Sequence, residues 1–96
     1  MYQPTRYSYL KAKLLGVKIY PSENPNKKLD VYKKGIKIAT IGDINYLDYP
    51  NFVKLEKAGK LIPGTAKKRR AAYLKRHAKT LKRKFSPSWY ASKILW

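Results

Sequence analysis

The chain has 96 residues and no cysteine, which limits it to one small domain and excludes disulfides and thiolate metal sites. Its 23 Lys and Arg residues against 5 Asp and Glu give a net charge of +18, which points to polyanionic partners. No apolar run approaches the roughly 18 residues of a membrane span, and the start lacks the apolar core of a signal peptide. We expect a protein that is intracellular or carried within an assembly.

The first thirteen residues mix tyrosines with basic side chains. Pro4 lacks a backbone N–H and is disfavoured inside a helix, so residues 1–13 are predicted to form an extended arm. Its tyrosines, beside Arg6, Lys11 and Lys13, could stack on nucleic-acid bases. They could equally pack on the surface of the domain itself, and the sequence leaves both interpretations open.

Three strands are predicted in the next part of the chain. Apolar and polar residues alternate over 15–20, which indicates a strand, and Pro21 ends it. Two further runs, 28–33 and 36–41, flank a two-residue turn in which Gly35 can supply a positive φ. Together these segments predict a three-stranded antiparallel meander with one apolar face, which the later helices would cover.

The hairpin turn also predicts a register. If Lys33 pairs with Ile36, then Val31 faces Ile38 on the partner strand. The apolar face would contain Leu29, Val31, Ile36 and Ile38, and the opposite face Asp30, Tyr32, Lys37, Ala39 and Ile41.

A short helix is expected after the meander. Asn51 can cap it, residues 52–58 would form it, and Gly59 would end it, while residues 44–49 form a helical turn or a loop. The pattern as a whole predicts an α+β fold in which a small meander precedes a short helix, a long basic helix and an aromatic end. Its parts are an arm at 1–13, the meander and short helix at 14–62, and the basic helix with a C-terminal anchor at 63–96, within one small domain.

The strongest feature is a basic helix from Ala66 to about Lys84. Thr65 can cap it with its hydroxyl, and no Gly or Pro interrupts it. Its apolar residues recur at helical spacing in a narrow seam, which leaves a wide cationic face. We predict that this face binds nucleic acid or an acidic partner through Lys67, Lys68, Arg69, Arg70, Lys75, Arg76, Lys79, Lys82, Arg83 and Lys84.

Two interpretations of this face remain. Residues 57–96 carry 13 basic side chains and no acidic one, so the like charges have no nearby counterpart. Bound phosphates would relieve the repulsion and release counterions. The alternative is a solvated basic face that serves solubility. No set of base-contacting side chains is recognisable, so we expect contacts to the phosphate backbone without base specificity.

The last segment begins at Ser86-Pro87, where proline suits the first turn of a new segment. It ends in residues too apolar to remain in water. One interpretation is a tail that docks on its own domain and completes a small core. The other is an anchor inserted into a partner protein and formed by Trp89, Tyr90, Ile94, Leu95 and Trp96.

No constellation of residues points to catalysis. His77, the only histidine, lies near the apolar seam and is expected to pack or to contact a phosphate. The acidic residues are scattered, Gly64 and Thr65 lack the rest of a phosphate-binding loop, and there is no set of zinc ligands. We therefore expect a non-enzymatic protein without cofactor or metal.

Three short motifs follow one another between residues 27 and 96: a Tyr-x-Asp-Tyr element, a basic Arg-x-x-Tyr-x-x-Arg-His helix and a Trp-containing end. Their positions are Tyr46, Asp48, Tyr49, Arg70, Tyr73, Arg76, His77, Trp89, Leu95 and Trp96. In this order they resemble a family of small basic proteins of unknown function encoded by large DNA viruses of algae and amoebae. The family pattern runs almost directly from the first motif to the second, whereas residues 51–66 intervene in this chain.

The resemblance implies a viral origin and offers no activity to transfer. It favours a non-enzymatic structural component of the virion, a minor or inner capsid-associated protein whose cationic helix faces acidic capsid protein or packaged genome. The alternative is a sequence-independent nucleic-acid-binding protein, either DNA-condensing or ribosome-associated and RNA-binding. The first places the protein in the virion as part of a larger assembly, and the second in the host cytoplasm or nucleus.

Overall fold

The computed structural model describes residues 1–96 and confirms the predicted α+β fold. The elements are α1 (Arg6–Leu15), β1 (Lys18–Pro21), β2 (Lys27–Lys33), β3 (Ile36–Asp43), α2 (Tyr49–Lys57), α3 (Thr65–Arg76), α4 (Ala78–Leu81) and α5 (Pro87–Ile94). The strands form an antiparallel sheet in the order β1-β2-β3, as the meander prediction requires. No helix combines the length and the apolar character needed to cross a membrane.

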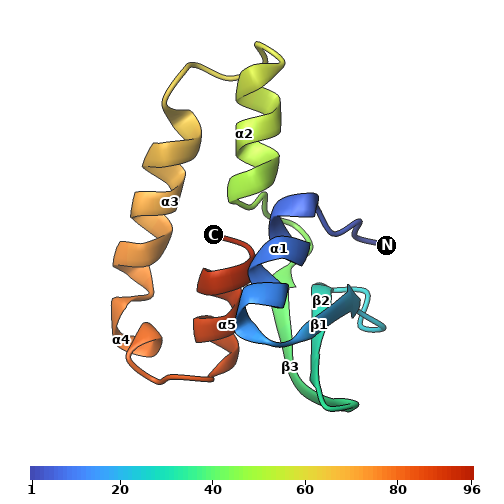
Figure 1. Cartoon of the computed structure of the whole chain (residues 1–96). Helices are drawn as coiled ribbons and strands as arrows, with labels where there is room; N and C mark the ends of the chain where they lie inside the picture. The colour runs from blue at the N-terminus through green and yellow to red at the C-terminus, as the bar shows by residue number, and fades with distance from the viewer.

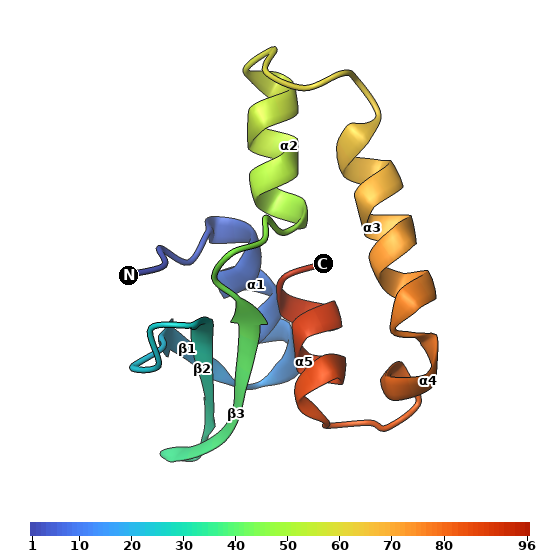
Figure 2. The same cartoon turned by 180° about the vertical axis from the view of Figure 1, so that it is seen from behind.

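The helices form two groups around the sheet. Helices α1 and α5 pack against each other and cover the sheet, while α2 and α3 form an antiparallel pair that extends away from it (Figure 1). Seen from behind, α5 lies between β3 and the α3–α4 segment (Figure 2). The core lies where these layers meet, and its fully buried large side chains include Leu29, Val31, Ile41, Ile94 and Leu95.

The register of the hairpin differs from the prediction by one residue. Lys33 pairs with Ile36 as expected, but the register shifts between Val31 and Tyr32, so Val31 pairs with Ala39. Such a bulge leaves one residue of β3, Ile38, without a partner on β2. Every residue of β3 after it then lies on the opposite face of the sheet from the one predicted. Leu29 and Val31 therefore share the buried face with Ala39 and Ile41, whereas Ile36 and Ile38 are exposed.

The predicted extended arm is wrong, because most of it forms α1. Pro4 lies before the helix, where its fixed φ and missing N–H disrupt no helical hydrogen bond. The next residue, Thr5, is the N-cap, and its side chain accepts a hydrogen bond from the N–H of Ser8. Gly16 ends the helix in the left-handed region at φ 73°. The helix takes up Leu15, so the first strand begins only at Lys18.

The boundaries of the later helices also need correction. Asp48, not Asn51, caps α2, so that helix starts three residues earlier than predicted, with Pro50 in its first turn. Thr65 is the first residue of α3 and not its cap, because its hydroxyl donates to the carbonyl of Ile62. The N–H of Ala66 is instead satisfied by the Glu56 carboxylate from α2, at 3.0 Å.

The predicted long helix is two helices separated at His77. The φ and ψ of His77, −100° and 11°, leave the helical region, and the chain turns there into α4. The turn leads the chain back, and α4 packs against α5. Ser86 then caps α5 by accepting from the N–H of Trp89, so a new helix does start at Pro87.

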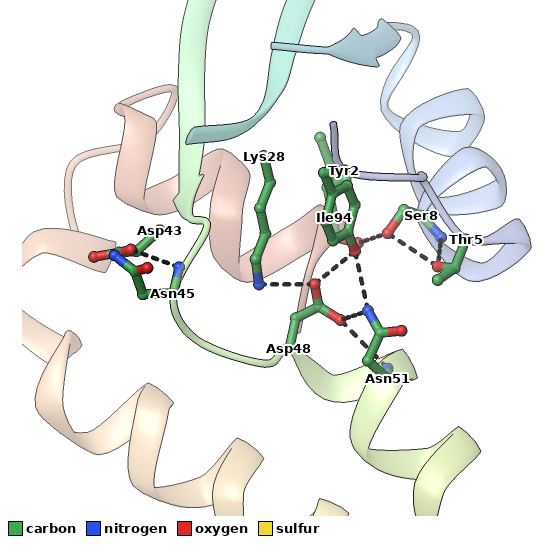
Figure 3. A network of polar contacts seen from close by, with 9 residues as sticks. All are labelled: Tyr2, Thr5, Ser8, Lys28, Asp43, Asn45, Asp48, Asn51 and Ile94. Carbon is green, nitrogen blue, oxygen red and sulfur yellow. Dashed lines mark hydrogen bonds and ion pairs between the residues drawn. The ribbon is translucent and has the colours of Figure 1, made fainter. Parts of the chain in front are cut away.

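A buried carboxylate joins the N-terminus, the sheet and α2. The side chain of Asp48 is fully buried, and it accepts from the Lys28 ammonium at 3.0 Å and from the Tyr2 hydroxyl at 2.6 Å (Figure 3). The Asn51 side-chain amide donates to it at 2.7 Å. The Lys28 side chain is itself only 5% exposed, so the pair is held away from water and each charge depends on the other.

We predict that Asp48→Asn lowers the free energy of unfolding by about 3–5 kcal/mol, because it leaves the buried Lys28 ammonium without its counter-charge. Urea denaturation measures the loss. Adding Lys28→Met to this variant should restore part of the stability, since the unpaired charge is then removed. The exposed Asp43→Asn is the control and should cost under about 1 kcal/mol. A loss for Asp48→Asn as small as that of the control would contradict the role of the buried pair.

Candidate nucleic-acid interface

The outer side of α3 is a cationic surface that no other element covers. Helix α3 stands at the edge of the molecule, with α2 and α5 on its inner side (Figures 1 and 2). Ala66 and Tyr73 are its buried residues and define the inner face. We define the α3 surface as the exposed basic residues of the other side: Lys67, Lys68, Lys75 and Arg76.

The predicted basic residues beyond α3 are exposed as well. The segment from α4 to the start of α5 carries Lys79, Lys82, Arg83 and Lys84. Because the chain bends at His77, these four do not continue the stripes that a single long helix would have formed. They add positive charge beyond the C-terminal end of α3.

No acidic side chain neutralises this charge. The two ion pairs of the structure join Lys28 to Asp48 and Lys37 to Asp30, both away from α3 and α4. Glu56, the acid that reaches α3, is bound to the backbone N–H of Ala66. The four basic residues of the α3 surface and the four that follow it therefore have no intramolecular counter-charge.

Arg69 and Arg70 differ from the other predicted residues because they contact aromatic rings of α2. The guanidinium of Arg69, although exposed, lies 5.9 Å from the centroid of Phe52, and that of Arg70 lies 5.0 Å from the centroid of Tyr49. Arg70 is turned inward, so its assignment to the outer face is a correction. Its Nε is buried and donates to no atom, and an unsatisfied buried donor costs about 1–3 kcal/mol.

An aromatic stack holds α3 in place. The ring of Tyr73 lies 4.4 Å from that of Trp96 at an interplanar angle of 10°, and 4.2 Å from the His77 ring on its other side. Phe52 of α2 contacts Trp96 at 6.2 Å. Nδ1 of His77 lies 3.0 Å from the Tyr73 carbonyl, which can only accept, so Nδ1 carries the proton. His77 is thus a packing residue, one of the two roles expected for it.

The residues predicted as a partner anchor belong mostly to the core of this chain. Tyr90, Ile94, Leu95 and Trp96 are each at most 9% exposed. Trp89 is partly buried and contacts Tyr90 edge to face at 5.1 Å. The structure thus has the alternative arrangement, a tail docked on its own domain, because these side chains fill the space among the sheet, α1 and α3.

A cavity on the inner side of α3 brings together residues that the sequence did not connect. Its volume is about 210 Å³, and Arg70 lines it with Lys11 of α1 and Lys93 of α5. Sequence analysis missed Lys11 and Lys93 as site residues, since 58 residues separate Lys11 from Arg70 and no spacing rule relates them. The remaining lining residues are Leu74, Leu81, Trp89 and Ser92.

Three tyrosines of this region are held in their neutral form. Burial raises the pKa of Tyr73, although the nearby Arg76 partly opposes it. Burial and the hydrogen bond to Asp48 raise the pKa of Tyr2, and burial raises that of Tyr7. The folded state therefore favours the protonated phenols, while in the unfolded chain they ionise near pH 10.

This predicts a loss of stability at alkaline pH. A phenol whose pKa is raised by folding contributes fully to the stability of the folded state below pH 10, and this contribution declines as the pH rises above 10. The decline in the free energy of unfolding is at most about 1.4 kcal/mol per pH unit for each tyrosine. Urea denaturation between pH 9 and 11.5 should show a shallower decline for Tyr73→Phe than for the unmodified protein. The exposed Tyr46→Phe should keep the original slope. An unchanged slope for Tyr73→Phe would contradict a buried neutral phenol.

The aromatic stack makes a second prediction. Trp96→Ala removes a buried ring that contacts both Tyr73 and Phe52, so it should lower the free energy of unfolding of the isolated protein by about 3–5 kcal/mol. Tyr46→Ala, at a residue 70% exposed, should change it by less than about 0.5 kcal/mol. If Trp96→Ala left the stability of the isolated protein unchanged, the ring would not be part of its core.

Comparisons with known proteins give no match: no family of proteins, no curated protein and no solved structure is similar to this chain. Some of the motif positions lie close together in the structure. Asp48 and Tyr49 begin α2, Arg70 contacts Tyr49, and Tyr73 stacks on Trp96. The contacts of Tyr49 with Arg70 and of Tyr73 with Trp96 thus help to hold α3, whereas Tyr46 and Arg76 are exposed and Arg76 belongs to the α3 surface.

Proposed function

We propose that the protein is a non-enzymatic, sequence-independent nucleic-acid-binding protein that contacts the phosphate backbone through the α3 surface and the basic residues that follow it. One observation carries the proposal: eight basic side chains of α3 and of the segment that follows it are exposed, and no acid neutralises them. A polyanion supplies the missing counter-charge, and the release of its condensed cations drives the association.

The size of α3 suits a duplex. Its 12 residues span about 18 Å at the 1.5 Å rise of a helix, and a duplex carries roughly ten phosphate charges over that length. The α3 surface consists of three lysines and one arginine around the small exposed residues Ala71 and Ala72. It lacks Asn and Gln, the side chains that read adenine by paired hydrogen bonds, and this favours contacts to phosphate over base readout.

The virion hypothesis stays a prediction. A capsid-associated protein that faces packaged genome would use the same α3 surface, so the two hypotheses coincide in what that surface binds. Four of the five residues expected to anchor a capsid partner are buried in the core of this chain, so their burial does not favour the capsid role over nucleic-acid binding. Nucleic-acid binding is therefore the function that the geometry supports best.

The test is binding of the purified protein to random-sequence duplex DNA across a salt series. We expect the logarithm of the association constant to fall linearly with that of the salt concentration, with a slope near 0.9 for each neutralised phosphate. A variant with Lys67, Lys68, Lys75 and Arg76 all changed to Gln should bind more weakly and flatten the slope by about 3 to 4. None of these four side chains makes a hydrogen bond or an ion pair, so the fold should tolerate the change.

A matched control separates the α3 surface from net charge alone. It changes four exposed lysines elsewhere, Lys13, Lys18, Lys27 and Lys34, to Gln and so loses the same total charge. The control should lose clearly less of the salt dependence than the α3 variant. Equal slopes for the two variants would show that the charge acts diffusely and that α3 is not the interface.

A further inference from the structure

We propose that the open cavity between α1, α3, α4 and α5 is a phosphate-binding site. It has a volume of about 210 Å³ and presents three cationic side chains, Lys11, Arg70 and Lys93, each from a different helix. No carboxylate lines it. Like charges brought together in one cavity repel, and a bound anion removes that repulsion.

The carboxylates at the start and the end of α2 are engaged elsewhere. The Asp48 carboxylate is bound to Lys28 and Tyr2, and the Glu56 carboxylate to the N–H of Ala66. No ion pair is formed by Lys11, Arg70 or Lys93. An anion that enters the cavity therefore competes with no internal counter-ion.

Arg70 gives the second, independent observation. It stands on the inner face of α3 between Ala66 and Tyr73, at spacings of four and three, where the helical pattern calls for an apolar residue. Its Nε is buried and has no partner, so a phosphate in the cavity would bind the terminal amino groups of the guanidinium. A charged residue that breaks the local apolar pattern is one expected at a binding site. The planar guanidinium suits the tetrahedral oxygens of a phosphate.

The walls of the cavity strengthen the attraction. Leu74, Leu81 and Trp89 are apolar and lower the local dielectric, so each charge acts on a bound anion more strongly than in water. Lys93 is exposed, which leaves the cavity accessible from solvent. The hydroxyl of Ser92 already donates to the Trp89 carbonyl at 2.7 Å, so we assign it no role.

The cavity and the α3 surface lie on opposite sides of α3, so the two proposals are tested separately. A free phosphate ion and a backbone phosphate of nucleic acid present the same chemistry to Lys11, Arg70 and Lys93.

Trp89 lines the cavity, whereas Trp96 is stacked in the core. The indole N–H resonance of Trp89 therefore also reports whether the cavity is occupied.

The first experiment titrates the protein with inorganic phosphate at constant ionic strength and follows the Nε–Hε resonance of Arg70 by NMR. We expect a saturable shift with a dissociation constant on the order of 1 mM. The double variant Lys11→Met, Lys93→Met keeps both aliphatic stems and should weaken binding at least tenfold. The control, Lys13→Met with Lys54→Met, removes the same charge from exposed residues of α1 and α2 and should bind phosphate normally. Equal affinity in the two double variants, or a shift that does not saturate, would overturn the proposal.

The second experiment distinguishes the source of the phosphate. If the occupant is a backbone phosphate, duplex DNA shifts the same Arg70 resonance, inorganic phosphate competes with it, and the cavity variant binds DNA more weakly than the control. If the occupant is a free phosphate ion, the two double variants bind DNA equally while only the cavity variant loses inorganic phosphate. A failure of the α3 surface as a DNA interface leaves the Arg70 titration intact, so each proposal can fail without the other.

Discussion

The carboxylate of Asp48 is the contact on which the rest of the structure depends. It lies out of water and is tolerated there because Lys28 of β2, the hydroxyl of Tyr2 and the amide of Asn51 satisfy it together. The same carboxylate caps α2 and so fixes where that helix begins. Helix α2 in turn positions α3, since Glu56 binds its first turn and Phe52 packs on Trp96 beside it. The position of the α3 surface thus depends, through α2, on the buried ion pair of Lys28 and Asp48.

The chain carries a net charge of +18 on a core of 14 buried hydrophobic residues. Self-repulsion on that scale works against any compact state. The structure limits it by pairing the one fully buried cation, Lys28, and by exposing the basic side chains of α3 other than Arg70. A bound polyanion would offset the remaining repulsion and stabilise the folded state by mass action. Function and stability are therefore linked through the same charges.

Sequence analysis was most successful where the signal is local. The Lys34-Gly35 turn, the pairing of Lys33 with Ile36 and the start of a new segment at Pro87 each depend on residues close in the chain, and each is confirmed. The first helix was missed because Pro4 was given more weight than the Thr5 cap and the terminal Gly16. The bulge opposite Val31 was missed because Ile36, Lys37 and Ile38 continue the alternation of apolar and polar residues that is typical of a regular strand. Burial under α5, and not the alternation, selects Ala39 and Ile41 for the core.

By itself the sequence determined the α+β class, the charge and its concentration in the last 40 residues, because these follow from composition and short-range patterns. Only the tertiary structure decided that α3 ends at His77, that Arg70 turns inward beside Lys11 and Lys93, and that Trp96 is a core residue. Helical periodicity places residues on a face but does not say which face is buried. That choice depends on segments tens of residues apart, and on which side chains of the C-terminal segment fill the space that the sheet and α3 leave between them.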